Sequence, residues 1–162
     1  LETNLTINPD CIAVAEMKGA ESMQAINAAN TGHSVITTIH ANSCEDTYYR
    51  MVTLCKQEQP GMDDATLQSL ATKAFPIVAF AKRLEDNSRR IMEITECETL
   101  QDGRKKMRTL YRFNITDNIM SEGKPKIIGH YEKVENLSEG LQKRLRENGL
   151  PLKMQEMLMA KR

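Results

Sequence analysis

The stretch TGHSVITTIHANS, residues 31–43, places a β-branched run between two histidines. The run VITTI, residues 35–39, contains strand formers and no turn residue, so it predicts a buried strand. An extended chain rises ~3.3 Å per residue, so His33 and His40 should lie roughly 20 Å apart. The two imidazoles therefore cannot share one metal ion or one small substrate.

The sequence around this strand predicts an alternation of strands and helices. Thr31–Gly32 is typical of a helix end, and Ser43 and Asp63 are typical of helix starts. Such an alternation indicates an α/β fold with parallel strands. The predicted elements are a strand over 11–15, a helix over 20–30, a strand over 35–39, and helices over 45–57 and 64–74.

From residue 77 onward the pattern changes to consecutive strands separated by polar turns. We expect these strands to form an antiparallel meander that extends the same sheet. Leucines at helical spacing then predict a helical tail, interrupted near Asn148–Gly149. The predicted elements are strands over 77–84, 89–97, 107–115 and, more weakly, 126–134, a turn at Gly123–Lys124, and two tail helices, the second starting at Leu150–Pro151.

The composition excludes several classes of protein. Lys plus Arg and Asp plus Glu both number 22, so no global field indicates a nucleic acid or an acidic substrate. No apolar run approaches the ~20 residues of a membrane span, and no signal peptide opens the chain. The chain begins at Leu1, and we expect it to be an excised part of a longer protein. Reduced thiols in a cytosolic protein, rather than a zinc site, are predicted for Cys11, Cys44, Cys55 and Cys97.

Two chemically capable side chains follow the two strands of the first βαβ unit. Glu16 comes directly after the first strand, and His40 comes directly after the second. Ligands gather outside the carboxyl ends of parallel strands, and a right-handed crossover makes neighbouring strands point the same way. We therefore expect Glu16 and His40 to share one edge of the sheet, with His33 at the opposite end of its strand.

In the sequence CIAVAE a carboxylate directly follows a hydrophobic strand. Walker B elements, which take part in phosphoryl transfer, have this arrangement. Two stretches of this chain resemble the atypical Walker B and the histidine box of the secretion ATPases. They are PDCIAVAEMKGAE, residues 9–21, and TGHSVITTIHANS. That family serves type II and type IV secretion, Tad-type pili and conjugation. Its strand ending in a phrase like ARLEDGSRKV corresponds here to AKRLEDNSRRI, residues 81–91, and the resemblance covers roughly residues 7–115.

The resemblance implies roles for individual residues. Glu16 corresponds to the catalytic glutamate that polarises the lytic water, with Mg²⁺ held indirectly through water, and His40 corresponds to the histidine that senses the γ-phosphate. Lys18 stands where the family has Arg and belongs with Glu16 and His40 to the nucleotide site, while Ala15 replaces a family Gly. Lys keeps the positive charge but lacks the planar fork of Arg. Structural or interface roles fall to Gly19, Gly32, His33 and Asn42.

A P-loop of the form GxxxxGK[ST], which would cradle the phosphates, does not occur in these 162 residues. We therefore expect part of a RecA-like P-loop NTPase sheet with an antiparallel meander extension and a small helical C-terminal tail. Residues 1–115 would be the carboxyl-terminal part of the ATPase domain, and residues 116–162 a strand and helical appendage. Alone, this polypeptide should hydrolyse ATP negligibly and should hold neither ATP nor Mg²⁺ tightly.

For the full-length protein the resemblance implies a homo-hexamer that uses ATP and Mg²⁺. It would act from the cytoplasm, peripherally at the inner face of the cell membrane, on a membrane-embedded platform protein, without direct contact with nucleic acid. The alternative is a non-catalytic interaction module for ring assembly or platform docking. A P-loop upstream of Leu1 would favour the motor.

Several other patterns allow both a functional interpretation and a simpler structural one. Ser43 with His40 and Asp46 suggests a nucleophile, but no GxSxG elbow is present and Ser43 is favoured as a helix N-cap. The basic cluster at 104–108 is favoured as a solvated hairpin end over a nucleic-acid site. His33 is either a helix-end or subunit-contact residue or a satisfied polar cap. The tail is a partner-docking helix or packs back on the domain, and residues 48–54 are favoured as core and subunit-contact positions.

Overall fold

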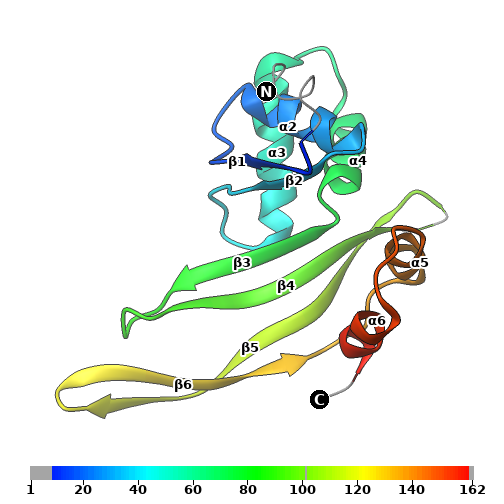
Figure 1. Ribbon diagram of the computed structural model, residues 1–162. Coiled ribbons are helices and arrows are strands. Elements are labelled where there is room, and N and C mark those ends of the chain that lie inside the picture. The colour runs from blue at the N-terminus through cyan, green and yellow to red at the C-terminus, as the bar shows by residue number, and fades with distance from the viewer. Residues whose placement is uncertain (1–8, 101, 161–162) are drawn as a thin grey trace. The chain divides into compact units, whose positions relative to one another are not determined.

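The computed structural model describes residues 9–100 and 102–160, and the chain divides into two compact units between Pro76 and Ile77. The predicted α/β class is confirmed: one unit is built on parallel strands and the other on antiparallel strands (Figure 1). In chain order the elements are β1 (Cys11–Val14), α2 (Glu21–Asn30), β2 (Ser34–Thr37), α3 (Cys44–Glu58), α4 (Asp64–Ala74), β3 (Ile77–Arg83), β4 (Arg89–Thr99), β5 (Lys105–Ser121), β6 (Lys124–Lys133), α5 (Glu139–Glu147) and α6 (Leu152–Met159).

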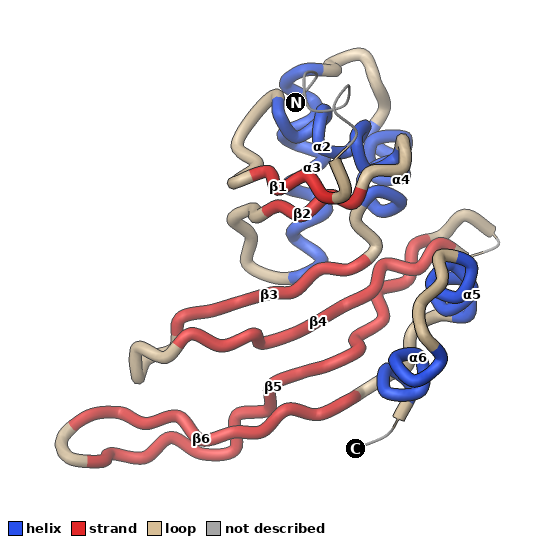
Figure 2. The backbone as a smooth tube through the Cα atoms, viewed as in Figure 1, coloured by secondary structure: helices blue, strands red, loops and turns tan. Residues whose placement is uncertain are grey.

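In the first unit, β1 and β2 lie side by side (Figure 2). They pair in parallel, with Val14 opposite Thr37. Burial of apolar side chains, which is the main favourable term in folding, holds this unit together. Buried side chains, at most 4 % exposed, come from β1 and from each of the three helices: Ile12, Ile26, Leu54 and Leu67. Ile36, by contrast, is 63 % exposed, so β2 is exposed on one face and half-buried on the other, and the prediction of a buried strand is wrong here.

The predicted helix limits of this unit are correct to within two residues because their caps form. The Ser43 hydroxyl accepts a hydrogen bond from the Asp46 N–H at 3.0 Å, and Asp63 accepts one from the Thr66 N–H at 2.9 Å. Gly32 ends α2 with a φ of 106°, a left-handed conformation that favours glycine. The following His33 N–H then reaches back to the Ala28 carbonyl at 3.2 Å, which completes a Schellman motif.

In the second unit, β3, β4, β5 and β6 form an antiparallel sheet in chain order (Figure 2). The expectation that this meander extends the β1–β2 sheet is wrong, because within the described residues β3 pairs only with β4. Short turns bring consecutive strands together, so the meander supplies its own pairing partners. The predicted division at residue 115 falls inside β5, and the assignment of residues 1–115 to a motor domain remains a prediction.

The sheet of the second unit has a small core beneath a close backbone contact. Leu84, Phe113 and Ile127 are buried together, and Met92 packs against them. Gly129 in β6 lies opposite Ile115 in β5. A Cβ atom on Gly129 would lie 2.4 Å from the Asn114 carbonyl oxygen and 2.6 Å from the Phe113 ring. Because glycine has no Cβ atom, the Phe113 ring can occupy this space.

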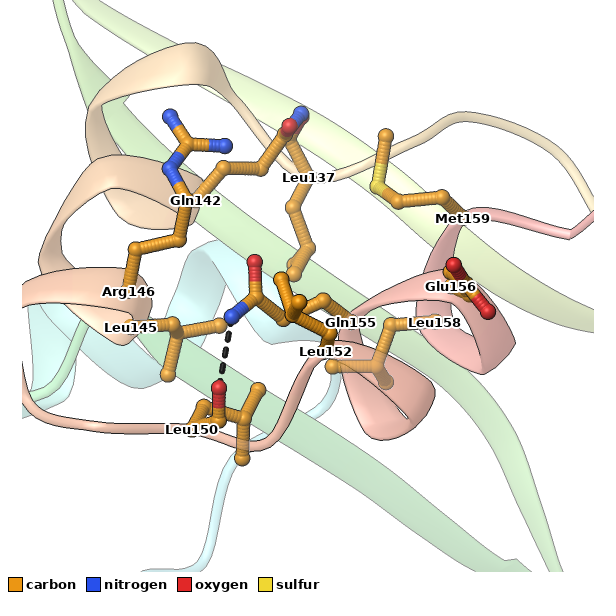
Figure 3. A pocket seen from close by; sticks show the side chains of 10 residues that line it. All are labelled: Leu137, Gln142, Leu145, Arg146, Leu150, Leu152, Gln155, Glu156, Leu158 and Met159. Atoms are coloured by element: carbon orange, nitrogen blue, oxygen red, sulfur yellow. Dashed lines mark hydrogen bonds between the residues drawn. The ribbon is translucent and has the colours of Figure 1, made fainter.

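Hydrogen bonds hold the helical tail to the second unit at both of its ends. Glu96 is 2 % exposed, and its carboxylate accepts hydrogen bonds from the Ser138 N–H at 2.8 Å and hydroxyl at 2.5 Å. The Lys133 ammonium donates to the Leu158 and Ala160 carbonyls at 2.5 and 2.9 Å. Between α5 and α6 lies a cavity of about 210 Å³, lined by Leu137, Leu145, Leu150 and other tail side chains (Figure 3).

Candidate functional site

The carboxyl ends of β1 and β2 bring Glu16 and His40 together. Backbone contacts continue beyond the strands: the Met17 N–H donates to the Thr38 carbonyl at 2.8 Å, and the Thr38 hydroxyl donates to the Ala15 carbonyl at 2.5 Å. The residues that follow each strand are thus held side by side. His40 Nε2 lies 3.2 Å from Glu16 Oε1, as expected for two groups on one edge of a parallel sheet.

Glu16 is held between two nitrogen donors. Lys18 Nζ lies 2.9 Å from Oε2, on the opposite carboxylate oxygen from the one that His40 approaches. The Glu16 side chain is 25 % exposed, whereas those of Lys18 and His40 are 72 % and 93 % exposed. The carboxylate is therefore partly enclosed by its own unit, while both nitrogen groups remain open to solvent.

A second carboxylate fixes the loop that carries Lys18. Glu21 Oε1 accepts hydrogen bonds from the backbone N–H groups of Lys18 at 2.5 Å and Gly19 at 2.9 Å. The bond from the Lys18 N–H is the largest of the causes that lower the pKa of Glu21 below its ordinary value. The sequence interpretation missed Glu21. An acidic residue in the first turn of a helix that follows a short loop was the available signal.

The remaining predicted site residues lie elsewhere in the same unit. His33 is at the start of β2, and neither of its buried ring nitrogens has a hydrogen-bond partner in the part of the chain that the structure describes. Among the described residues, no hydrogen bond makes the ring a satisfied cap. Asn42 is exposed in the bend before α3, and Gly32 ends α2. A Cβ atom on Gly19 would make only ordinary contacts, so steric crowding does not require glycine there.

Two alternative sites receive no support from the geometry. The Ser43 hydroxyl serves as the α3 cap, and the His40 ring faces Glu16. In the basic cluster, Arg104 pairs with Asp102 at 2.7 Å, and Arg108 lies 2.6 Å from Glu98 and 2.7 Å from Glu135. Several of these cations are thus already paired within the second unit.

None of the four cysteines, all of which lie in the described ranges, forms a disulfide, and burial raises the pKa of Cys55 to about 11, which keeps it protonated at neutral pH. Within residues 9–100 and 102–160, no group of three or more metal-binding side chains occurs. In the same ranges no helix is long and apolar enough to cross a membrane.

The edge formed by Glu16, Lys18 and His40 can serve one end of a phosphoryl-transfer site. The carboxylate can orient or deprotonate a water, and the exposed nitrogens can donate to phosphate oxygens. Glu16 can also bind Mg²⁺ through a water, since carboxylates suit this ion. The described residues offer no backbone cradle for the other phosphates. The fit is thus to the water and terminal phosphate, not to a whole nucleotide.

Comparisons with known proteins point to one family. The model of the family described as "Type II/IV secretion system protein" matches residues 1–160. The type IV secretion system protein VirB11 of Brucella suis is 39 % identical over 62 residues, covering 38 % of this chain and 17 % of that protein. The type IV pilus assembly ATPase PilB of Pseudomonas aeruginosa is 28 % identical over 162 residues, covering 96 % of this chain and 27 % of that protein.

A solved structure shares the fold. The crystal structure of the VirB11 ATPase from the Brucella suis type IV secretion system, in complex with sulphate, aligns with a TM-score of 0.55 and 28 % identity. The alignment covers 59 % of this chain and 30 % of that one. The chain thus spans less than a third of the length of each of these relatives.

Proposed function

Since the chain belongs to the type II/IV secretion system protein family, we propose that it forms part of a motor that couples ATP hydrolysis to secretion or pilus assembly. The observation that carries this proposal is the Glu16 carboxylate, held between Lys18 and His40 where two parallel strands end. Ligands of open α/β sheets bind at that edge.

Each side chain has a distinct role in the proposed site. Glu16 orients the attacking water and accepts its proton. His40 donates from its exposed ring toward the terminal phosphate, and stabilises the charge that develops there. Lys18 adds a positive charge on the same side, as a point charge rather than a bidentate clamp. ATP supplies the transferred phosphoryl group, and Glu16 would hold Mg²⁺ only through an intervening water.

The rest of the nucleotide site lies in other parts of the protein under this proposal. The 162 residues contain no GxxxxGK[ST] sequence, and the relatives are more than three times as long as the segments they share with this chain. The complete protein would assemble as a homo-hexamer, the assembly that the family resemblance implies. It would act at the inner face of the cell membrane on a membrane-embedded platform protein.

The test compares the complete gene product with the 162-residue polypeptide. We expect Mg²⁺-dependent ATP hydrolysis by the former, and by the latter a turnover far below ~1 per second. In the complete protein, Glu16→Gln should lower kcat by about 10²- to 10⁴-fold, the usual contribution of a positioned acid or base. Glu85→Gln, in the exposed β3–β4 turn, is the matched control and should leave kcat unchanged.

Two results would contradict the motor. One is turnover by the polypeptide alone at the rate of an ordinary enzyme. The other is a complete protein that forms rings but hydrolyses no ATP. The second result would favour the alternative function, an interaction module for ring assembly or platform docking.

A further inference from the structure

One threonine ties together the two segments that carry the candidate site. The regular pairing of β2 with β1 ends at Thr37. Beyond that point the Thr38 hydroxyl donates to the Ala15 carbonyl at 2.5 Å, and the Thr38 carbonyl accepts from the Met17 N–H at 2.8 Å. Thr38 is therefore bonded to the residues on both sides of Glu16.

These two bonds differ in kind. The bond from the Met17 N–H joins two backbone groups, as the bonds of a parallel ladder do. The bond to the Ala15 carbonyl comes from a side chain. Among small side chains only those of serine and threonine offer a hydroxyl donor, and threonine also suits an extended backbone. The identity of residue 38 thus decides whether Ala15 is held.

The contacts of the Glu16 carboxylate itself are weaker restraints. Lys18 and His40, which approach its two oxygens, are 72 % and 93 % exposed, and exposed ion pairs contribute little to stability. In the proposed reaction both nitrogen groups also donate to phosphate oxygens. The bonds to the backbone on either side of Glu16 are independent of that exchange, so they can hold the carboxylate while its partners change.

We propose that Thr38 is a positioning residue for the hydrolysis reaction. Its hydroxyl fixes the backbone from which Glu16 directs its carboxylate toward the attacking water. Thr38 therefore acts through Glu16 and does not itself touch the reacting atoms. Rates depend steeply on such geometry, since a displacement of about 1 Å can cost about a hundredfold. The inference rests on the proposed function, because it assigns Thr38 to the same site.

The competing role for Thr38 is direct binding of a phosphate oxygen, because its side chain is exposed. The geometry favours positioning: a hydroxyl has one hydrogen to donate, and the Ala15 carbonyl accepts it. The two roles also differ in their kinetics. Loss of a positioning bond lowers kcat at an unchanged KM, whereas loss of a contact with bound substrate raises KM.

The test substitutes Thr38 in the complete protein. Thr38→Val removes the hydroxyl and keeps a β-branched side chain of similar size. Because Thr38 is exposed, the change leaves no cavity, and thermal unfolding should stay as in the wild type. We expect kcat to fall about tenfold or more, with KM within about twofold of the wild type.

Two further variants test whether the hydroxyl is responsible. Thr38→Ser keeps a hydroxyl at this position and should retain most of the wild-type kcat. Thr37→Val is the matched control, because it makes the same substitution one residue earlier. The Thr37 hydroxyl lies 3.4 Å from the Thr38 carbonyl, beyond the usual range of an O–H···O hydrogen bond. Thr37→Val should therefore leave kcat and KM unchanged.

A double-mutant cycle tests whether Thr38 acts through Glu16. In a Glu16→Gln protein the base is already lost, so adding Thr38→Val should change kcat by less than about twofold. Two residues that act independently would instead show the product of the two single losses. Single-turnover measurements with enzyme in excess keep the slow variants measurable.

Hydrogen exchange of the Met17 amide supplies a readout that needs no activity. The Met17 N–H is bonded to the Thr38 carbonyl, so it should exchange severalfold faster in Thr38→Val and as in the wild type in Thr37→Val. An unchanged Met17 amide in Thr38→Val would show that the hydroxyl does not fix this backbone, and would overturn the proposal.

Three kinetic results would also overturn it: wild-type kcat in Thr38→Val, a raised KM at unchanged kcat, and independent losses in the double variant. Glu16→Gln separates these failures from a failure of the proposed function. If Glu16→Gln lowers kcat and Thr38→Val does not, the positioning role alone is wrong. A complete protein that hydrolyses no ATP, but whose Met17 amide responds as expected, contradicts the motor and leaves Thr38 as the residue that fixes this loop.

Discussion

The two units of the chain position their polar side chains by different rules. In the first unit, two parallel strands end together, so Glu16 and His40 meet although they belong to different loops. In the second unit, antiparallel register decides the neighbours, and Arg112 lies opposite Glu93 while Lys82 lies opposite Arg90. The first arrangement brings polar side chains together at one edge of a sheet, whereas the second distributes charged side chains along the strands.

Under the proposed function, this difference separates side chains that take part in the reaction from side chains that stabilise the fold. The first unit leaves the imidazole of His40 93 % exposed, so a ligand can reach it. The second unit buries a carboxylate, Glu96, whose oxygens are occupied by Ser138. Substitutions in the two units should therefore affect different measurements.

The sharpest test of the comparison divides the two histidines of the first unit. In the complete protein, His40→Ala should lower kcat about a hundredfold, the usual cost of removing a donor to developing charge. Folding and nucleotide affinity should be largely retained. His33→Ala should instead destabilise the first unit or loosen the oligomer, because its ring nitrogens are buried away from the Glu16 edge.

Turnover and oligomer size are measured on both variants, with His130→Ala in the second unit as an exposed control. If both His33→Ala and His40→Ala abolish hydrolysis in otherwise stable rings, the division between reaction and structure is wrong.

The next effect concerns packing in the second unit. Gly129→Ala should lower the free energy of unfolding by about 1–3 kcal/mol, the usual range for overpacking. The added methyl would overlap the Asn114 carbonyl and the Phe113 ring, and backbone would have to move. Gly61→Ala in the first unit is the matched control, since nothing lies within 4 Å of its Cβ position and its φ is not left-handed.

Urea unfolding of both variants, with kcat measured in parallel on the complete protein, provides the check. A Gly129→Ala protein as stable as the Gly61→Ala protein would show that the close approach in β6 is not a packing constraint. Loss of kcat without loss of stability would place the second unit in the reaction itself.

The sequence predicted the elements well because local signals determine them. Ser43, Asp63 and Gly32 ended or began helices where caps were expected. The separate antiparallel sheet was not predictable from the same signals, because pattern and propensity identify a strand but not its pairing partner. The extension of β5 to Ser121 was also missed, since Asp117 and Asn118 interrupt the strand pattern and the last residues are held only by pairing with β6.

The sequence likewise predicted some contacts of the candidate site and not others. The approach of His40 to Glu16 followed from strand direction and from the residues at the strand ends. The contact of Lys18 with Glu16 depends on a side-chain rotamer, and the Glu21 bonds depend on the backbone path of the loop. Neither is set by residue type and spacing. The His33 ring, which has no hydrogen-bond partner among the described residues, likewise depends on what surrounds it in three dimensions.

The smallest expected effect concerns Glu21 and the loop that carries Lys18. The folded state lowers the pKa of Glu21 from its ordinary value of 4.5, chiefly through the Lys18 N–H. The charged carboxylate therefore stabilises the loop above pH 4.5, and this contribution is lost as the pH falls through the lowered pKa. Glu21→Gln should weaken the protection of the Lys18 and Gly19 amides by about 1 kcal/mol or less at neutral pH. It should also abolish the acid dependence of that protection.

Hydrogen exchange, corrected for intrinsic rates, measures both quantities, with Glu139→Gln in the first turn of α5 as the control in the second unit. Equal protection in wild type and Glu21→Gln across this range would show that Glu21 does not fix the loop, and that the Lys18 contact with Glu16 is held by the ion pair alone.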